Sequence, residues 1–363
     1  MLYRPADAID PARLRRVLVT KLRHHGDVLL ASPVLSALKA AAPQAEVDAL
    51  VYADTADMLS LHPALSHLHL VDRRWRHASL PERLRAEWQL YAALRERAYD
   101  LIVHLTDQGR GAWLARRLGA RASVAPDAPG KSDWWRRSFT HRYPLPANGG
   151  RHTVELNLDA LRRIGIQPDE SSRSLVLVPG EAAEAAVDAM LAGHGLAPRG
   201  FVHLHPSSRW RFKCWETAPT AALADALDAR GLRVVLTAAP DDAERAMVRD
   251  ILAACRSRPV DLSGQLSLKQ LAALSARARL FVGVDSAPMH IAAAMGTPVV
   301  ALFGPSGERE WGPWRVPHRV VASTTHACRP CGNDGCGGGK LSECLSTLPL
   351  ARVLEAADAL LAA

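Results

Sequence analysis

Three segments of the sequence place acids, hydroxyls and cations directly after short apolar runs. They are Lys21–Asp27 (KLRHHGD), His205–Trp215 (HPSSRWRFKCW) and Phe281–Ser306, which begins FVGVDSAPMH. Because a short apolar run bounded by polar residues predicts a buried strand, these polar groups would lie at the carboxyl ends of strands. In open α/β sheets that edge binds anionic ligands. The sequence therefore predicts an anion site at these strand ends.

The third segment carries the most information. After the apolar run Leu280–Val284 come Asp285 and Ser286, and Pro288 suits the first turn of a helix of small residues. The first turn of a helix offers backbone N–H groups to an anion, and Ser286 adds a hydroxyl. His290 follows one turn later, so this strand end suits a diphosphate. Asp285 has two interpretations, because it could cap the helix or bind sugar hydroxyls.

The other two segments offer complementary groups. In the second, Ser207 and Ser208 are hydroxyl donors, and Lys213 is a flexible cation of the kind that binds phosphate. In the first, Asp27 follows Gly26 and either starts a helix or acts as a general base. A carboxylate can take a proton from a sugar hydroxyl when the transfer is concerted with bond breaking at an electrophilic carbon.

The elements that must position these groups alternate along the chain. Apolar runs predict strands at 16–21, 47–52, 68–71, 101–105, 201–205, 233–238, 260–262, 280–284 and 299–303. Helical patterns lie between them, and the first helix could open at Gly26-Asp27 or at Ser32-Pro33. The polar stretch Ala125–Gly150 predicts an exposed excursion. Two successive βα series predict an α/β fold with two doubly wound, Rossmann-like domains facing across a cleft.

The chain of 363 residues is long enough for two domains with separate cores. We expect them at residues 1–178 and 179–345, followed by a helix in 346–363 that packs back on the first domain. No apolar run reaches the roughly 18 residues that cross a bilayer. The N-terminus also lacks the apolar stretch of a secretory signal, so we expect a cytoplasmic protein.

The formal net charge of +8 and the pI near 9.5 predict an acidic partner. Basic residues lie beside tryptophan at Arg73–Arg76, Trp134–Arg137, Arg209–Arg211 and Trp314-Arg315. One interpretation is arginine stacked on tryptophan at a solvated surface. The other is a surface for phosphorylated or lipid-anchored substrates, because arginine pairs with phosphate and tryptophan favours membrane interfaces. Helix-turn-helix, RRM and zinc-finger spacings are absent, which disfavours nucleic acid as a partner.

Four of the six cysteines crowd together late in the chain, at Cys328, Cys331, Cys336 and Cys344. This spacing could hold a structural metal, form a redox pair or pack as reduced thiols in a glycine-rich loop, and the last is favoured. The signatures GxGxxG, GxxxxGK[ST], HExxH and GxSxG are all absent. Their absence counts against dehydrogenase, P-loop NTPase, zincin and α/β-hydrolase functions.

Taken together, the segments resemble the ADP-heptose:lipopolysaccharide heptosyltransferases, members of glycosyltransferase family 9 with the GT-B fold. The resemblance covers nearly the whole chain, through KLRHHGDVLLASPVLSALK, YDLIVHLTD, RHTVELNLDALRRIGI, HPSSRWRFKCWE, GQLSLKQLAAL and GVDSAPMHIAAAMGTPVVALFGPS. The stretches HPSSRWRFKCWE and NLDALRRIGI are most similar to the heptosyltransferase III subgroup. The resemblance implies inverting transfer of L-glycero-D-manno-heptose from ADP-heptose to a hydroxyl of the lipopolysaccharide inner core, as a side branch, without a metal or other cofactor.

The resemblance also implies a role for each site residue. Asp27 takes the place of the catalytic base, and Lys213 assists catalysis by neutralising the diphosphate. The donor would be held by Ser207, Ser208, Lys213, Asp242, Leu266, Asp285, Ser286, Ala287 and His290. Two serines stand here where two threonines are more familiar, and Ala287 replaces a frequent glycine.

The implied acceptor is a phosphorylated lipid A–core molecule on the cytoplasmic face of the inner membrane, which the enzyme would reach as a peripheral, monomeric protein. The residues expected to bind it are Arg73, Arg74, Arg76, Trp134, Arg136 and Arg137. Two alternatives stay open at this point. One is a sugar-nucleotide 2-epimerase of the same fold, and the other is a non-catalytic nucleotide-sugar binding protein.

Overall fold

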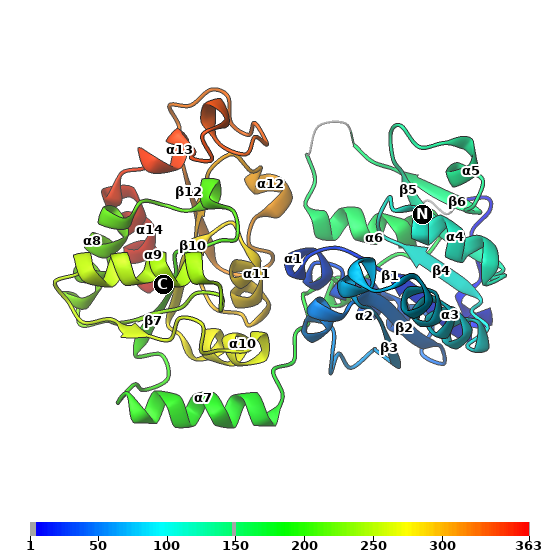
Figure 1. Cartoon of the computed structure of the whole chain (residues 1–363), viewed down its shortest axis with the longest axis horizontal. Coiled ribbons are helices and arrows are strands. Elements are labelled where there is room, and N and C mark those ends of the chain that lie inside the picture. Colours follow the sequence, from blue (N-terminus) through cyan, green and yellow to red (C-terminus); the bar gives the residue numbers. More distant parts are fainter. Residues whose placement is uncertain (1–4, 147–149, 363) are drawn as a thin grey trace. The chain divides into compact units, whose positions relative to one another are not determined.

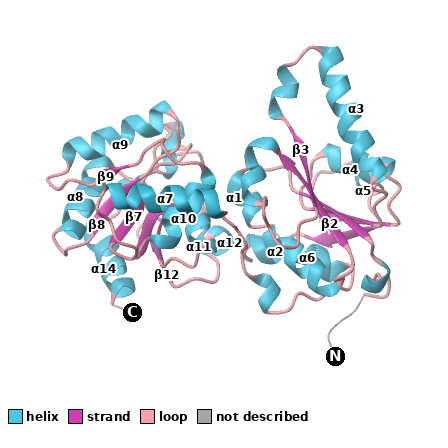
Figure 2. Cartoon of the chain, turned by 90° about the horizontal axis from the view of Figure 1, so that it is seen from below, coloured by secondary structure: helices cyan, strands magenta, loops and turns pink. Residues whose placement is uncertain are grey.

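The computed structural model describes residues 5–146 and 150–362. The chain divides into two compact units, residues 1–177 and 178–363, at a point one residue from the expected boundary (Figure 1). Each unit holds one parallel sheet with helices on both faces, as Figure 2 shows. The end of the expected excursion, residues 147–149, lies outside the described residues.

The sheet of the first unit has six strands in the order β3-β2-β1-β4-β5-β6, and every neighbouring pair is parallel. The strands are β1 Arg16–Thr20, β2 Glu46–Tyr52, β3 His67–Val71, β4 Leu101–His104, β5 Ala122–Asp127 and β6 His141–Pro144. In β1 the apolar residues point to both faces, because helices cover both, and its central residues Val17–Val19 are therefore continuously apolar rather than alternating.

The helices of the first unit divide between the two faces of this sheet. Helices α3 and α4 cover one face, while α2 and α6 pack together on the other. The α-helices are α1 His25–Leu29, α2 Ser32–Ala41, α3 Leu80–Glu96, α4 Gly109–Arg117, α5 Asp133–Arg136 and α6 Thr153–Arg163. Short 3-10 helices are η1 Pro11–Arg13, η2 Ala53–Met58, η3 Arg73–His77 and η4 Ser171–Arg173. Two separate helices form where the sequence predicted one. Helix α1 opens around Gly26-Asp27, and α2 opens at Ser32-Pro33, so each candidate start belongs to a helix.

The expected exposed excursion over Ala125–Gly150 is wrong, because most of it belongs to the fold. It supplies the end of β5, all of α5 and the edge strand β6. Trp135, Phe139 and Tyr143 are buried, and Trp135 and Phe139 lie 4.9 Å apart between ring centroids. The proline and arginine residues of this stretch interrupt the apolar runs by which strands are recognised in a sequence. Proline is tolerated near a sheet edge, and the apolar anchors are too widely spaced to give a periodic signal.

The sheet of the second unit also has six parallel strands, in the order β12-β11-β10-β7-β8-β9. The strands are β7 Phe201–His205, β8 Arg233–Leu236, β9 Val260–Asp261, β10 Leu280–Val284, β11 Val299–Phe303 and β12 His318–Ala322. The edge strand β12 was not expected, because only three of its five residues (HRVVA) are apolar. The other five strands were expected, with ends that differ by at most two residues.

Helices α7 and α10 pack on one face of this sheet, and α8, α9 and α14 pack on the other. The α-helices are α7 Glu181–Gly193, α8 Thr217–Asp228, α9 Asp242–Ala254, α10 Leu268–Arg277, α11 Ala287–Ala294, α12 Glu308–Trp311, α13 Glu343–Ser346 and α14 Leu350–Leu361. The 3-10 helices are η5 Arg211–Lys213 and η6 Cys336–Gly338. The expected capping box opens α10, where Ser267 and Gln270 satisfy each other's backbone N–H groups.

The terminal helix α14 corrects one expectation about the domains. It was expected to pack back on the first domain, but it belongs to the second unit. Val353 and Ala357 are fully buried in that unit's core, together with residues of α8 and β10. The physical reason is that α14 covers an apolar strip of its own sheet beside β12, which would otherwise face water.

Both sheets have a topological switch point, where consecutive strands leave in opposite directions. In the first sheet it lies between β1 and β4, and in the second between β7 and β10. Ligands of doubly wound proteins bind outside the carboxyl ends of the strands at such a point. The sheet orders therefore select the segments after β1, β4, β7 and β10 as the candidate site.

A buried charge network at the opposite end of the first sheet joins β2 and β3 to the segment that precedes β4. Asp48 has no exposed surface, and its carboxylate accepts hydrogen bonds from Arg97 Nε at 2.8 Å and from Tyr99 Oη at 2.7 Å. His69 Nε2 lies 2.9 Å from Tyr99 Oη. Although burial opposes ionisation, hydrogen bonds from His69, Arg97 and Tyr99 lower the pKa of Asp48 to about 2.

We predict that Asp48→Asn lowers the free energy of unfolding by about 3 kcal/mol at pH 7, because it leaves the Arg97 charge poorly paired. A carboxyl group whose pKa is lowered by folding stabilises the protein above its unfolded pKa and loses that effect as the pH falls. The difference between wild type and variant in urea unfolding should therefore shrink between pH 4 and pH 2.

The matched control is Asp133→Asn, since the Asp133 side chain is 84% exposed and 3.7 Å from Arg137. It should change the unfolding free energy by less than about 0.5 kcal/mol. An Asp48→Asn variant as stable as this control at pH 7 would show that the network does not stabilise the fold.

Candidate active site

An ion pair joins the two segments that meet at the switch point of the second sheet. Lys213 ends η5 in the loop after β7, and Asp285 directly follows β10. Lys213 Nζ lies 2.6 Å from Asp285 Oδ2, with the lysine side chain 23% exposed and the aspartate 7% exposed. An ammonium group has three donors, so this contact leaves donors for a ligand phosphate. Asp285 is therefore fixed by Lys213 rather than acting as the cap of α11.

Ser207 is held by a residue that the sequence did not single out. Its side chain is fully buried, and its Oγ donates a hydrogen bond to Glu244 Oε2 at 2.7 Å. Glu244 lies in the first turn of α9 and is itself buried. Because the hydroxyl proton is used by Glu244, Ser207 can offer a ligand its backbone N–H or its oxygen lone pairs. Ser208 is half-buried, and its Oγ accepts a hydrogen bond from the Trp210 backbone at 3.3 Å.

Two buried histidines of β7 stabilise the carboxyl end of this strand by contacting the same threonine. His205 Nδ1 lies 2.8 Å from Thr237 Oγ1, and His203 Nε2 lies 2.7 Å from the same oxygen. Burial lowers the pKa of His205 to about 3, so the ring is neutral near pH 7. The histidines fix the strand end and the loop that follows it, and they carry no charge toward the site.

The start of α11 places the other predicted phosphate ligands. Ser286 is the extended N-cap residue, with Ala287 at the first helical position. Pro288 has no N–H, and the Met289 N–H donates to Ser286 O at 3.1 Å. The backbone donors that remain for an anion are those of Ser286 and Ala287, where the helix dipole is positive. His290 is only 3% exposed and lies inside the unit, so it borders the site from within.

Asp242 and Leu266 occupy neighbouring strand ends. Asp242 is exposed at the first position of α9, after β8, whereas Asp241 caps that helix by accepting from two backbone N–H groups. Leu266 follows β9 and is partly buried against the core beneath α10. All the predicted donor residues thus lie at the carboxyl edge of one sheet, and the parallel strands bring them there.

In the first unit, Asp27 lies half-buried in α1, after the switch-point strand β1. Lys21 directly follows β1 and is buried. Its Nζ donates to Leu105 O at 3.2 Å and to Asn157 Oδ1 at 3.0 Å. Burial lowers the pKa of Lys21 to about 8, and the charge of Asp27 acts in the opposite direction. The buried ammonium group of Lys21 and the carboxylate of Asp27 therefore interact electrostatically.

Arg73 is brought close to the Asp27 segment. Its guanidinium lies 3.7 Å above the Tyr52 ring, donates to Arg23 O at 3.0 Å and pairs with Asp54 at 3.1 Å. His25 of α1 contacts the backbone oxygen of the same aspartate at 2.8 Å. Arg73 therefore fixes the loop around Asp27 as well as adding positive charge to it.

The remaining predicted acceptor residues lie on the surface in two groups. Arg74 pairs with Asp72 at 2.7 Å, and the Arg76 side chain is exposed beside His77. Trp134 is 49% exposed, with the Arg116 guanidinium 5.3 Å from its ring.

Arg136 and Arg137 belong to the second of these surface groups, with Trp134 on α5. Arg136 lies 3.9 Å from Asp127 and Arg137 lies 3.7 Å from Asp133. Asp107 links this region to the Asp27 loop, because it pairs with both Lys131 and Arg23 at 2.9 and 3.1 Å. Both groups thus border the same edge of the first sheet.

The cysteines are free thiols in the described part of the chain. Cys328, Cys331 and Cys336 are exposed and Cys344 is buried. Burial raises the pKa of the Cys344 thiol, with smaller contributions from the other three thiols. Within residues 5–146 and 150–362, no group of three or more His, Cys, Asp or Glu side chains is arranged to hold a metal ion.

The site contains three residues that sequence reasoning missed, namely Glu244, Thr237 and Asn157. Each is a buried polar residue whose partner lies at least 30 positions away along the chain. No local pattern marks such a residue. The exception is Glu244, which falls on the apolar face of α9 at the i, i+4, i+7 spacing with Val248 and Ile251, and a charged residue on such a face needs a buried partner.

Known proteins resemble this chain in sequence and in fold. Residues 87–341 match the family described as glycosyltransferase family 9 (heptosyltransferase). The chain is 40% identical to lipopolysaccharide heptosyltransferase 3 of Escherichia coli over 295 residues, which is 81% of this chain and 84% of that protein.

Solved structures share the fold. A family 9 glycosyltransferase from Veillonella parvula has a TM-score of 0.84 at 22% identity, covering 98% of this chain and 99% of that one. An E. coli heptosyltransferase with ADP has a TM-score of 0.72 at 20% identity, covering 95% and 99%. The sequence match and the shared fold agree with the GT-B expectation, and they show that this chain belongs to glycosyltransferase family 9, the heptosyltransferase family.

Proposed function

We propose that this enzyme transfers L-glycero-D-manno-heptose from ADP-heptose to a hydroxyl of the lipopolysaccharide inner core, with inversion at the anomeric carbon. The observation that carries the proposal is the placing of Asp27 at one switch point and of the Lys213–Asp285 pair at the other. The E. coli relative is named lipopolysaccharide heptosyltransferase 3. That name supports lipopolysaccharide as the acceptor and the heptosyltransferase 3 type of linkage. The ADP in the solved relative supports the nucleotide.

In the proposed reaction, Asp27 accepts the proton of the acceptor hydroxyl as its oxygen bonds to C1 of the heptose. The C1–O bond to ADP breaks on the opposite face, and ADP leaves with the electron pair. Lys213 and the N-terminus of α11 stabilise the charge that grows on the diphosphate. Asp285 would bind heptose hydroxyls, Asp242 the ribose and Leu266 the adenine. Ser207 and Ser208 would hold the diphosphate from the β7 loop.

We predict that Asp27→Ala lowers kcat by about 10²–10⁴ and leaves ADP binding unchanged, because a general base acts only on the transferred proton. Turnover is measured as ADP release with a truncated core acceptor, and ADP binding as a thermal shift. Asp57→Ala is the matched control, since Asp57 lies on η2, which packs against α1. Full activity in Asp27→Ala would remove Asp27 from the mechanism.

Substitutions of Lys213 and of Asp285 should have different effects, the first on the affinity for ADP and the second on the binding of the sugar. We predict that Lys213→Ala weakens ADP binding about 10- to 100-fold, through the loss of a charge-assisted hydrogen bond. Asp285→Asn should leave ADP affinity within about threefold while raising KM for ADP-heptose, because the carboxylate contacts the heptose and not the nucleotide.

Isothermal titration with ADP and initial rates with ADP-heptose measure the two effects. Arg211→Ala, two residues before Lys213 and half-exposed beside Glu216, is the control for a lost cation in the same loop. Equal losses of ADP affinity in the Lys213 and Asp285 variants would contradict the separation of roles. Protection against thermal unfolding by UDP rather than ADP would favour a 2-epimerase instead.

The acceptor is proposed to bind the basic surface of the first unit, at the cytoplasmic face of the inner membrane. Supporting this, Arg73 sits at the Asp27 loop and Arg74, Arg76, Trp134, Arg136 and Arg137 border the same sheet edge. Among the described residues, no helix has the length and apolar character to cross a membrane. We therefore propose a peripheral enzyme that reaches its acceptor from the membrane surface, and a monomer.

We predict that Arg76→Gln/Arg137→Gln raises KM for a phosphorylated core acceptor several-fold at 50 mM salt and has little effect at 500 mM, since salt screens exposed charges. Initial rates at both salt concentrations measure this effect. The same acceptor without phosphates should not respond. Arg258→Gln, an exposed arginine of the second unit, is the control. A KM of the wild-type enzyme that does not depend on salt would contradict phosphate recognition by this surface.

A further inference from the structure

Helix α3 leaves a row of large apolar side chains uncovered. Leu80, Leu84 and Trp88 follow one another at four-residue intervals and are 68%, 60% and 66% exposed. Of the 17 residues of α3, only Leu94 is buried. An amphipathic helix that served only to cover its sheet would turn its large apolar residues inward. This row therefore faces something other than the core of the unit.

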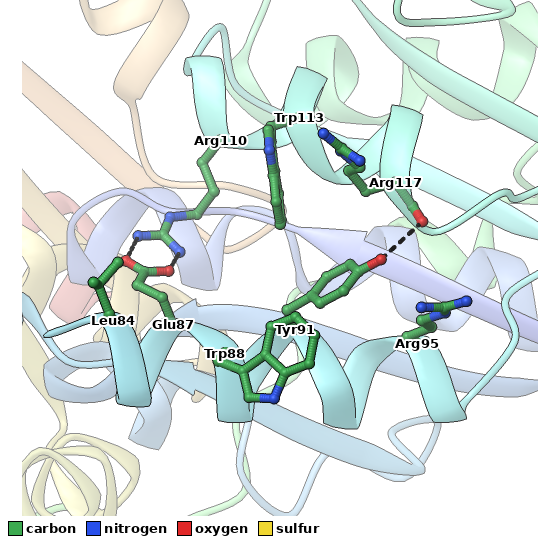
Figure 3. A pocket seen from close by; sticks show the side chains of 8 residues that line it. All are labelled: Leu84, Glu87, Trp88, Tyr91, Arg95, Arg110, Trp113 and Arg117. Atoms are coloured by element: carbon green, nitrogen blue, oxygen red, sulfur yellow. Dashed lines mark hydrogen bonds and ion pairs between the residues drawn. The ribbon is translucent and has the colours of Figure 1, made fainter. Parts of the chain in front are cut away.

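Beside this row lies a groove between α3 and α4 with a volume of about 650 Å³. It is lined by Leu84, Glu87, Trp88, Tyr91, Arg95, Arg110, Trp113 and Arg117, which we call the α3–α4 groove (Figure 3). Three aromatic rings run along it. The Trp88 and Tyr91 centroids are 5.8 Å apart, and those of Tyr91 and Trp113 are 5.2 Å apart.

The charge of the groove is positive. Its one acidic residue is Glu87. A bidentate ion pair with Arg110 neutralises the charge of this carboxylate, with both N–O distances 2.5 Å. The exposed guanidinium groups of Arg95 and Arg117 lie at the other end, on either side of the Tyr91 ring (Figure 3). Tyr91 Oη donates to Arg117 O at 3.3 Å, which fixes the ring between them. Outside the groove, the exposed Arg83 and Arg85 of α3 are matched by the exposed Glu82 and Glu96, so the excess positive charge comes from the arginines that line the groove.

From these features we infer that the α3–α4 groove and the adjoining row Leu80–Leu84–Trp88 form a docking surface for an anionic lipid bilayer. Exposed leucine and tryptophan on one helix face, with arginines beside them, are the composition of a helix that lies in the headgroup region. Tryptophan is enriched at that depth, and arginine pairs with lipid phosphates. Each side chain of the row is at least 60% exposed, which suits contact with an extended bilayer surface better than enclosure of a small solute.

The position of this surface fits the proposed function, on which the biological meaning of the inference depends. Helix α3 follows β3 through η3, and α4 follows β4, so both helices begin at the carboxyl edge of the sheet. Leu80 and Arg110 lie in these first turns, at the same edge as Asp27, and Leu84 follows one turn later. A bilayer that contacts them would lie beside the edge to which a lipid-anchored acceptor must come.

The test is co-sedimentation of the full chain with extruded vesicles, without donor or acceptor. We expect binding to phosphatidylglycerol–phosphatidylethanolamine vesicles and weak binding to phosphatidylcholine vesicles. Leu84→Ser/Trp88→Ser and Arg95→Gln/Arg117→Gln should each reduce the partition coefficient at least about tenfold, since one arginine near an anionic surface contributes roughly fivefold. The controls are Leu145→Ser/Leu341→Ser and Arg258→Gln/Arg319→Gln, exposed residues outside the surface, which should bind like the wild type.

Three outcomes would overturn the inference. They are no binding of wild type to anionic vesicles, equal losses in the control variants, or groove variants that change self-association in sedimentation velocity but bind vesicles normally. Turnover with a lipid-free core acceptor separates this inference from the proposed function. The groove variants should keep full turnover there, whereas failure of the proposed function would abolish turnover in every variant and leave vesicle binding intact.

Discussion

The close parallel pairing of β10 with β7 is the constraint on which the candidate donor site depends. Gly283 lies opposite His205 in the register, and a Cβ at that position would come within 2.9 Å of the His205 carbonyl oxygen and 2.7 Å of the Phe281 ring. The two strands can approach only because residue 283 has no side chain. That approach brings the loop after β7 to the end of β10, and Lys213 reaches Asp285 as a result.

In each unit, a polar or charged side chain of the candidate site is held by partners from distant parts of the chain. Ser207 is fixed by Glu244, and Lys21 by Asn157 and the backbone of β4's end. Each of these groups is buried, and a buried polar group without a partner is costly, so the surrounding structure limits each to few orientations. Such restraint suits a transferase, because transition-state stabilisation needs groups that are already in place when charge develops.

The first unit combines a structural charge network with a basic surface, and the two lie at opposite ends of its sheet. Asp48, Arg97 and Tyr99 are buried and paired at the amino end of the strands. The exposed arginines gather toward the carboxyl edge and along α3 and α4. The positive charge of the chain is therefore concentrated where an anionic acceptor or membrane would meet the enzyme.

From the sequence alone, one signal, the apolar run, located nine of the twelve strands in the described part of the chain. Strands such as β7 and β10 were found because they are buried on both faces, and β5, β6 and β12 were missed or misplaced because their prolines, arginines and histidine interrupt that signal. Asp27, Lys213 and Asp285 were selected as candidate site residues because their residue types follow such runs and because the motifs around them resemble one family. Only the tertiary structure decided that Lys213 pairs with Asp285, that Glu244 holds Ser207 and that α14 packs on its own sheet. The Ser207–Glu244 and Lys213–Asp285 contacts join residues 37 and 72 positions apart, and a local pattern carries no information about such a partner.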